Sequence, residues 1–455
     1  MTIELLKSRI RGTAIGVLEP DFVQAHDGLV WNGRKPASRA RIVVRAASVD
    51  DVAATVRYAA ERGRTVSPRG GGHHLTGIAA AADVIADLSR LDRLSIDAGA
   101  RRAIVGPGVT NARLCAALAR HDLAFPAGHC GSVPMSGYLI GGGIGWNSGA
   151  WGAACESVEE IELVTASGEI LTASAGDNPD LFWAARGAGP GFFAIATRFT
   201  LRLRTAPVIV SAVRVHPAEA APAVAAWAEG AMAHAPACVE LSVKAARMEG
   251  PAGTLPALAA TPTVFASCEE EGRDIQAALA KGAPAGAFFA QAPAIVGFGD
   301  LYIATGRGTP AGARYGFDCA WSDAPFAAML KPLADSIRPA PSPLSFSVAV
   351  LRSPEAAMPS GSAFSMIGRS YGVTYATWQD PEDDAANLAW LRRTMDAVHP
   401  FGCGTYAGQA DLDRSGLRPA THSAFAAERL ARLREFHDPA GTFGQPTRTD
   451  TCRAA

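Results

Sequence analysis

The fold of this chain is best predicted from one glycine-rich stretch, Pro68-Arg69-Gly70-Gly71-Gly72-His73-His74-Leu75-Thr76-Gly77. The residues just before it, Thr65-Val66-Ser67, favour a short β-strand because two of the three are β-branched. Three consecutive glycines after a strand let backbone N–H groups approach a ligand without an intervening Cβ, and successive N–H groups can form an anion-binding nest. The stretch therefore predicts a loop that holds an anionic group such as a diphosphate; the alternative is a flexible surface loop.

A second glycine-rich segment extends from residue 128 to residue 152 and contains Gly141-Gly142-Gly143-Ile144-Gly145. Neither glycine segment has the pattern of a nicotinamide-binding unit, in which G-x-G-x-x-G joins a strand to a helix and an acidic residue follows about 20 residues later. A dehydrogenase built on a Rossmann fold is therefore disfavoured.

The segments around these loops predict a first lobe rich in strands. Strands are expected at 41–44, 83–88, 103–105, 157–164, 168–173 and 193–203. Ser48 and Asp51 form a capping-box pattern that predicts the start of a helix, and another helix is expected near 110–120. Pro207 marks the predicted end of this lobe.

After Pro207, alanine-rich helical windows at 218–233 and 325–337 alternate with strand-like segments at 344–351 and 370–378. A further helix is predicted at 421–433. This alternation predicts an α+β second lobe. We expect three segments: 1–207, 208–405, and a C-terminal segment 406–455 that returns to the first lobe.

Composition narrows the class of partner. The chain has 455 residues, of which 48% are apolar and 19% are charged, so a folded protein with more than one lobe is expected. The formal net charge is −1 with both signs dispersed, which disfavours nucleic acid and favours a small-molecule partner. No apolar run approaches the roughly 20 residues that span a bilayer, so no membrane association is expected.

Compartment and metal binding follow from the N-terminus and the cysteines. The first residues, Met1 to Lys7, include an acid and no long apolar run, so we expect no secretory signal and a cytoplasmic protein. The eight cysteines show no CxxC spacing, and the adjacent His73 and His74 lack a third spaced ligand, so no metal site is expected.

The glycine motifs resemble those of the FAD-linked oxidases typified by berberine bridge enzyme, within the vanillyl-alcohol-oxidase or PCMH-type superfamily. Arg69 to Gly77 matches the family motif R-S-G-G-H-x-x-x-G except at the serine. Gly128-His129-Cys130-Gly131-Ser132-Val133, with Gly137 and Gly141 to Gly143, is similar to G-x-C-x-x-V-G-x-G-G-H-x-x-G-G-G. Leu181 to Phe193 resembles the W-A-x-R-G-G-G-G-N-F segment, and the stretch from Tyr406 to Phe443 resembles the closing pattern.

This resemblance implies an α+β fold: a PCMH-type FAD-binding domain of two α/β subdomains, and a substrate domain with an antiparallel sheet backed by helices. It implies FAD bonded to His73, with Cys130 as a second attachment point. The implied cofactor-binding residues are Arg69, Gly70, Gly71, Gly72, His73, His74, Gly77, Gly128, Cys130, Val133, Gly137, Tyr138, Gly141, Gly142, Gly143, Gly145, Trp146, Phe193, Ile195 and Phe443.

Three residues carry the implied chemistry. Tyr406 takes the family position on the substrate side of the flavin, where a lowered pKa would let it accept a proton as hydride leaves for N5. Val133 takes the position that leaves room for O2, which implies an oxidase. Tyr138 replaces a histidine that supports reduced flavin. Its alternative, like that of Trp146, is an ordinary core aromatic residue, and that of Tyr406 is a tyrosine satisfied in the second lobe.

The implied activity is oxidation of a CH–OH or CH–NH centre in a bulky small molecule such as a sugar, alcohol or secondary metabolite, with O2 as electron acceptor. The chain departs from the family pattern at Pro134-Met135-Ser136 and at Gln409, where a second tyrosine is common. Three alternatives therefore stay open: a dehydrogenase, an oxidative cyclase of the same fold, and a flavin-containing binding protein without turnover.

Overall fold

The computed structural model of the chain describes residues 3–36, 39–414 and 419–444. The N-terminal part of the first lobe is a four-stranded sheet in which three neighbouring strands are parallel. Its spatial order is β1 (Thr13–Gly16), β2 (Ile42–Arg45), β4 (Val84–Asp87) and β3 (Val66–Arg69). The accompanying helices are α1 (Glu4–Lys7), α2 (Phe22–Asp27), α3 (Val49–Ala60) and η1 (Ile78–Ala81).

The predicted start of the first long helix is confirmed. Ser48 precedes α3 in an extended conformation, and its hydroxyl accepts a hydrogen bond from the Asp51 backbone N–H. That bond satisfies one of the N–H groups that have no partner inside the helix. The parallel pairing of β3 with β4 brings the glycine run that follows Arg69 to one edge of this sheet.

An antiparallel five-stranded sheet completes the first lobe. Its order is β5 (Leu94–Asp97), β6 (Arg102–Val105), β10 (Ile195–Arg202), β8 (Val158–Val164) and β9 (Ile170–Ser174), and β7 (Leu123–Ala124) pairs separately with β11 (Arg204–Thr205). The predictions of strands at 103–105, 157–164, 168–173 and 193–203 are confirmed. The helices here are α4 (Asn111–Leu118), η2 (Ala119–His121), α5 (Met135–Ile140), α6 (Ser148–Trp151), η3 (Ala154–Ser157), α7 (Pro179–Ala185) and η4 (Gly189–Gly191).

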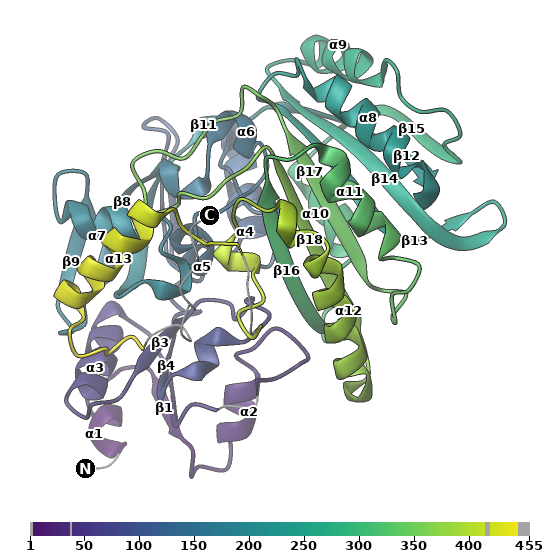
Figure 1. Cartoon of the computed structure of the whole chain (residues 1–455). Helices are drawn as coiled ribbons and strands as arrows, with labels where there is room; N and C mark the ends of the chain where they lie inside the picture. The colour runs from purple at the N-terminus through teal and green to yellow at the C-terminus, as the bar shows by residue number, and fades with distance from the viewer. Residues whose placement is uncertain (1–2, 37–38, 415–418, 445–455) are drawn as a thin grey trace.

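The second lobe is a seven-stranded antiparallel sheet with helices on one face (Figure 1). The strand order is β15 (Phe289–Val296), β12 (Val208–Pro217), β14 (Gly253–Ala266), β13 (Val239–Gly250), β17 (Phe346–Arg352), β18 (Ser370–Trp378) and β16 (Arg314–Ser322). The other elements are η5 (Ala218–Ala220), α8 (Ala221–Met232), α9 (Glu269–Ala280), α10 (Phe298–Gly306), α11 (Phe326–Asp335), η6 (Pro381–Asp383), α12 (Asp384–Asp396), η7 (His399–Phe401) and η8 (Ala407–Gln409).

Alternation along β13 separates the two faces of this sheet. Leu241 and Val243 are fully buried in the core formed with α8, α9, α11 and α12. Glu240, Ser242 and Lys244 alternate with them, so they point to the opposite face, toward the first lobe. The sheet therefore presents to the glycine loops the face that lacks these four helices, termed the uncovered face below. Helix α10 and the residues just after it lie along part of this face, since a Cβ on Gly308 would meet Lys244 and Phe346.

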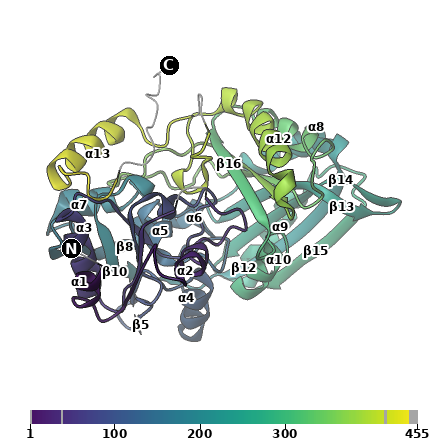
Figure 2. The ribbon, with the colours of Figure 1, turned by 90° about the horizontal axis from the view of Figure 1, so that it is seen from below.

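The C-terminal segment returns to the first lobe. Helix α13 (Ala424–His437) lies beside α7 in both views, and Arg429 pairs with Asp180 at 2.6 Å (Figures 1 and 2). The Val66 N–H at the start of β3 then donates to the carbonyl of Thr442 at 2.7 Å. The helix predicted at 421–433 is confirmed, although it begins and ends slightly later. The lobe boundaries themselves stay predictions.

Across the described ranges, no helix combines the length and the apolar character that crossing a membrane requires.

Candidate active site

Arg69 fixes the shape of the first glycine loop. Its guanidinium donates to the carbonyls of Leu29, Gly70 and Gly71 at 2.8 to 3.2 Å and pairs with Asp87 at 3.2 Å. Because the Arg69 guanidinium binds carbonyl oxygens of the loop on one side, the loop can turn its backbone N–H groups toward a ligand on the other.

The glycines of this loop allow close approach of the second glycine-rich segment. A Cβ on Gly70 would lie 1.6 Å from the Ser136 hydroxyl, and a Cβ on Gly71 would lie 2.5 Å from the Pro134 ring. Gly72 has φ of +64° and its Cβ would meet the Leu29 carbonyl at 1.9 Å. The two predicted motifs are thus one contiguous structure, and larger residues at these positions would separate them.

His73 lies where the two motifs meet. Its ring stacks on Trp31 with centroids 4.9 Å apart and bonds to the backbone of Ser132, two residues beyond Cys130. Burial and the positive charge of Arg69 nearby lower the pKa of His73 to about 4. The bond to Ser132 raises this pKa, but its effect is weaker. The imidazole is therefore neutral at ordinary pH, which is the nucleophilic form.

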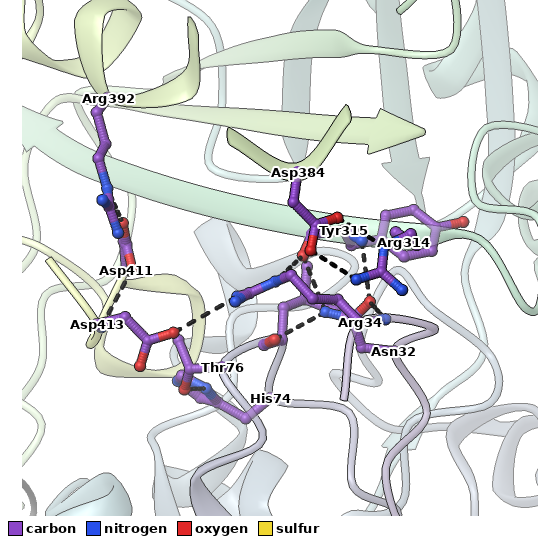
Figure 3. Close-up of polar contacts among 11 residues, drawn as sticks. Asn32, Arg34, His74, Thr76, Arg314, Tyr315, Asp384, Arg392, Asp411 and Asp413 are labelled. Carbon is purple, nitrogen blue, oxygen red and sulfur yellow. Dashed lines mark hydrogen bonds and ion pairs between the residues drawn. The ribbon is translucent and has the colours of Figure 1, made fainter. Parts of the chain in front are cut away.

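His74 connects the first glycine loop to the C-terminal segment and to the second lobe; its predicted role in cofactor binding stays a prediction. One ring nitrogen lies 2.8 Å from the hydroxyl of Thr76 (Figure 3). The other lies 3.1 Å from the carbonyl of Ala407, and the ring packs edge-on against Phe317. Gly77 follows with φ of +67° and is packed against Pro36. The structure places both residues at the base of the loop.

Cys130 lies on a turn that is held from two sides. Asn111 bonds to the backbone of Gly128, Cys130 and Val133, at 2.8 to 3.4 Å. On the other side, the Thr305 hydroxyl of α10 donates to the carbonyl of His129 at 2.8 Å. The Cys130 thiol is partly exposed and lies 3.4 Å from the Ser132 hydroxyl, so it remains open to a ligand. Val133, also partly exposed, packs against the core of the first lobe.

The Tyr138 side chain packs against three glycines of the second glycine-rich segment. Cβ atoms on Gly128 and Gly143 would lie 3.0 Å from its ring, and one on Gly145 would lie 2.3 Å from its hydroxyl. That hydroxyl donates to the Pro126 carbonyl at 2.6 Å, and burial raises its pKa. The predicted catalytic role for Tyr138 thus has no free hydroxyl to act with, and the core alternative fits this placement.

Tyr406 comes from the C-terminal segment and reaches the other end of the same glycine segment. Its ring packs edge-on against Phe364, and the backbone of Gly143 and Ile144 hydrogen-bonds to its hydroxyl. The expected lowering of its pKa is wrong: burial raises the pKa of Tyr406, and the two backbone bonds offset this only in part. The reason is desolvation, because the ring lies in an apolar cluster with Trp321.

Seven other predicted residues vary in their access to a ligand. Phe193 and Ile195 are at most 1% exposed, and Phe193 stacks on His437 of α13, so only their backbone can meet a cofactor. Phe443 is also packed in the first-lobe core. Trp146 packs against Phe265 of the second lobe. The remaining glycines are Gly137, which is exposed, and Gly141 and Gly142, which are buried beside Tyr406 and Phe364 respectively.

The uncovered sheet face supplies residues that the motifs do not identify. Gln409 accepts from the Tyr371 hydroxyl at 2.5 Å and donates to the Tyr375 hydroxyl, both on β18. Tyr315 of β16 packs against Trp31 with ring centroids 5.0 Å apart, and Trp31 stacks on His73, so this tyrosine lies next to the first glycine loop. Gln409 is marked in the sequence by its departure from the family's closing pattern, whereas the tyrosines and Trp31 belong to no local motif and only their aromatic character marks them.

The described residues fit a flavin better than a metal. They include no group of three His, Cys, Asp or Glu side chains arranged to hold an ion. They do combine loops with little space for Cβ atoms, a neutral imidazole and an accessible thiol at one junction, and an aromatic sheet face opposite. His73 and Cys130 would hold the ring system of FAD, and the glycine N–H groups its phosphates.

Comparison with known proteins also indicates that FAD is the cofactor. A family model described as an FAD binding domain matches residues 40–174. The FAD-linked oxidoreductase nodO of Hypoxylon pulicicidum is 31% identical over 417 residues, which cover 90% of this chain and 91% of that protein. (R)-6-hydroxynicotine oxidase of Paenarthrobacter nicotinovorans is 35% identical over 179 residues, or 39% of each protein.

The fold also matches a solved structure. Berberine bridge enzyme from Eschscholzia californica superposes with a TM-score of 0.83 at 20% identity, and the match covers 98% of both chains. That identity supports the fold alone, whereas the full-length similarity to nodO supports the family. The chain is therefore an FAD-linked oxidoreductase that belongs to the berberine bridge enzyme-like family of PCMH-type FAD-binding proteins.

Proposed function

We propose that this oxidoreductase oxidises a CH–OH or CH–NH centre of a bulky small molecule, with FAD bonded covalently to His73 and O2 as the final electron acceptor. When bound, FAD takes up the substrate's hydride at N5 and passes the electrons on. The surrounding residues bind, orient and shield the reacting groups.

The observation that carries the proposal is the neutral, half-buried imidazole of His73 at the junction of both glycine segments. Burial holds its pKa at about 4, and stacking on Trp31 restricts its orientation. His73 would hold the flavin through a bond from its ring nitrogen to the flavin methyl carbon; the methyl and imidazole protons would leave to solvent, and O2 would accept the two electrons released. A covalent bond would prevent loss of the cofactor during turnover.

A second bond, from Cys130 to the flavin ring, is supported by position. The Ser132 backbone bonds to His73, and Ser132 lies on the same turn as the Cys130 thiol. Asn111 and Thr305 restrain that turn from opposite sides. One cofactor ring placed at this junction would therefore meet both nucleophiles.

On the substrate side, Tyr406 acts as a neutral hydrogen-bonding group. The Gly143 and Ile144 amides donate to its oxygen, which leaves its own proton to donate to the substrate's oxygen or nitrogen. The aromatic residues of β18 and β16 form an apolar wall suited to a bulky substrate. The relative named (R)-6-hydroxynicotine oxidase supports a CH–NH centre as one class to test.

The test is anaerobic mixing of the flavin-loaded enzyme with candidate alcohols, sugars and secondary amines. Bleaching of the flavin by one class supports the proposed oxidation. A flavin that no compound reduces would instead support the binding-protein alternative. Admission of O2 then separates an oxidase, which forms hydrogen peroxide and recovers its colour quickly, from a dehydrogenase, and a new ring in the organic product identifies an oxidative cyclase.

Val133→Leu extends this test. Val133 is partly exposed on the Cys130 turn, and the larger side chain should slow recovery by O2 about tenfold or more while it spares reduction by substrate. Equal recovery in both enzymes would count against a role of Val133 in oxygen access. The cytoplasmic location also stays a prediction, which fractionation of the source cells would check.

A further inference from the structure

Lys244 is a cation on the uncovered face of the second-lobe sheet. It lies on the central strand β13, directly opposite Val348 of β17. Its neighbours along that face of β13 are Glu240 and Ser242, since residues two apart in a strand point the same way. Lys244 therefore points toward the first lobe, which is the side of the sheet where the proposed substrate site lies.

The ammonium group of Lys244 has an aromatic neighbour and no acidic one. Nζ lies 4.4 Å from the centre of the Phe346 ring, and a Cβ on Gly308 would lie 3.0 Å from it. Within the described ranges, Lys244 forms no ion pair and no hydrogen bond, and burial lowers its pKa. A cation held over an aromatic ring without a counter-ion is costly unless a ligand supplies the charge.

The nearest acid on the same row of β13 is already engaged. Glu240 lies four residues away, about 13 Å along an extended strand. Its carboxylate approaches His129 of the first lobe at 3.6 Å. Glu240 thus contacts the loop that carries Cys130, and the ammonium group is left without a carboxylate from its own strand.

Aromatic rings connect Lys244 with the proposed flavin site. Phe346 stacks on Tyr375 with centroids 4.8 Å apart and planes 17° from parallel. Tyr375 bonds in turn to Gln409 and packs edge-on against Phe317, whose ring packs edge-on against His74 of the first glycine loop. A planar substrate lying along this wall would place its far end beside the ammonium group while its near end faces the flavin.

We infer that Lys244 binds an anionic oxygen of the substrate, a carboxylate or an ionised phenol, and so selects planar anionic molecules. This inference rests on the proposed function, because it names the substrate class of the same site. A lysine that merely extends to solvent is the alternative. The two differ in whether charge on a ligand affects its affinity.

The experiment compares ligands that differ in charge and little in shape. Benzoate is compared with benzamide, and 4-nitrophenolate with 4-nitroanisole, by calorimetry on the flavin-loaded enzyme at a pH where the phenol is ionised. We expect the wild type to bind at least one of the two anions about ten- to hundredfold more tightly than its neutral partner, as a charge-assisted hydrogen bond provides. Which pair discriminates identifies carboxylate or phenolate.

Variants assign the preference to the residue. Lys244→Met, which keeps the length and removes the charge, should lose it, and Lys244→Arg should keep it. Lys331→Met is the matched control, because Lys331 is exposed on α11 and pairs with Asp335. No preference in the wild type, or a preference that survives in Lys244→Met, would overturn the inference. Failure of the proposed oxidation would appear separately, as bound flavin that no compound reduces.

Discussion

At the scale of single residues, chemistry at this site depends on which protonation state burial selects. His73 is half-buried and Tyr406 is buried, and both are neutral, but for opposite reasons. Burial disfavours the protonated imidazole and lowers its pKa, and it disfavours the phenolate and raises its pKa. His73 is thereby activated as a nucleophile, whereas Tyr406 is kept as a hydrogen-bond donor.

The low pKa of His73 predicts how attachment depends on pH. Apo-protein from a riboflavin-starved host, mixed with FAD, should form the covalent adduct nearly as fast at pH 5.5 as at pH 7.5. An exposed histidine would lose about tenfold over that range, because its pKa lies near 6.5. A tenfold fall between the two pH values would show that the imidazole is not buried as described. Acid-stable flavin absorbance measures the rate.

The lowered pKa of His73 also determines how the folding stability changes with pH. A folded-state pKa below the unfolded value means that the unfolded chain binds the proton more tightly between pH 6.5 and 4. His73 therefore contributes stability that is present above pH 6.5 and is lost as the pH falls toward 4. His73→Gln should make the pH dependence of apo-protein unfolding shallower in that window.

Tyr406→Phe tests the neutral phenol. The variant should retain its flavin and lose about ten- to hundredfold in kcat/KM through one missing hydrogen bond to substrate. Because burial keeps the phenol protonated, the limbs of the pH profile between pH 6 and 9 should not move. A basic or acidic limb that disappears in the variant would mean that Tyr406 ionises during turnover. Tyr58→Phe, in α3, serves as the control.

The sequence identifies some of these residues and misses others for a physical reason. His73, Cys130 and Tyr406 lie in local motifs, so their neighbours in the chain mark them. Lys244 and Trp31 reach the site only through tertiary packing, and no local pattern marks them. The sequence also does not show in which direction the pKa of Tyr406 shifts, since that depends on side chains from segments far apart in the chain.

At the scale of elements, the C-terminal turn after α13 supports the first glycine loop. Asp438 is fully buried, and its carboxylate accepts from the backbone N–H groups of Thr442 and Phe443 at 2.7 and 3.0 Å. The carbonyl of Thr442 in turn accepts from Val66 in β3, the strand that leads into Arg69. The turn thus extends the edge of the sheet that carries the cofactor loop.

Asp438→Ala should lower the free energy of unfolding by about 2 to 4 kcal/mol, because two buried N–H groups lose their acceptor. It should also weaken flavin retention if attachment at His73 is blocked, since β3 loses its terminal support. Glu435→Ala, an exposed acid on α13, should have little effect in the same urea titration. Equal stability of the two variants would mean that the turn contributes nothing to the loop.

Element prediction succeeded where periodicity was strong. Helix α3 and strands β8 and β18 follow their amphipathic or β-branched patterns. The long hairpin of β13 and β14 was not predicted, because alanine, glycine and proline weaken its β-propensity. Helix α5 was missed for a related reason, since it lies within a glycine-rich segment.

At the scale of the whole molecule, the site exists only where the two lobes meet. Asn32 of the first lobe is fully buried and bonds to both the carbonyl and the N–H of Tyr315 in β16, at 2.9 Å each (Figure 3). Arg34 adds a contact to Asp413, and His74 adds one to Ala407. These contacts hold the uncovered sheet face against the glycine loops.

Asn32→Ala should therefore affect binding more than cofactor content. We expect a loss of about 2 to 4 kcal/mol in stability, since several buried partners are left unsatisfied, and a raised KM with flavin retained. Gln291→Ala, an exposed amide in β15, is the control. An unchanged KM would show that the lobes are positioned by other contacts. The sequence predicted two lobes but not which residues join them, because the joining residues are distant along the chain.

Mass spectrometry of the intact enzyme shows whether FAD is bonded to the chain at His73, as we propose. The intact enzyme should exceed the mass of its chain by that of one FAD, and a peptide map should join the His73 and Cys130 peptides through that FAD. His73→Ala should shed its flavin into the acid supernatant or hold it by Cys130 alone. A Cys130 peptide that alkylates freely would leave only the His73 bond. A wild-type enzyme with the bare chain mass, whose flavin washes out intact in acid, would contradict the claim.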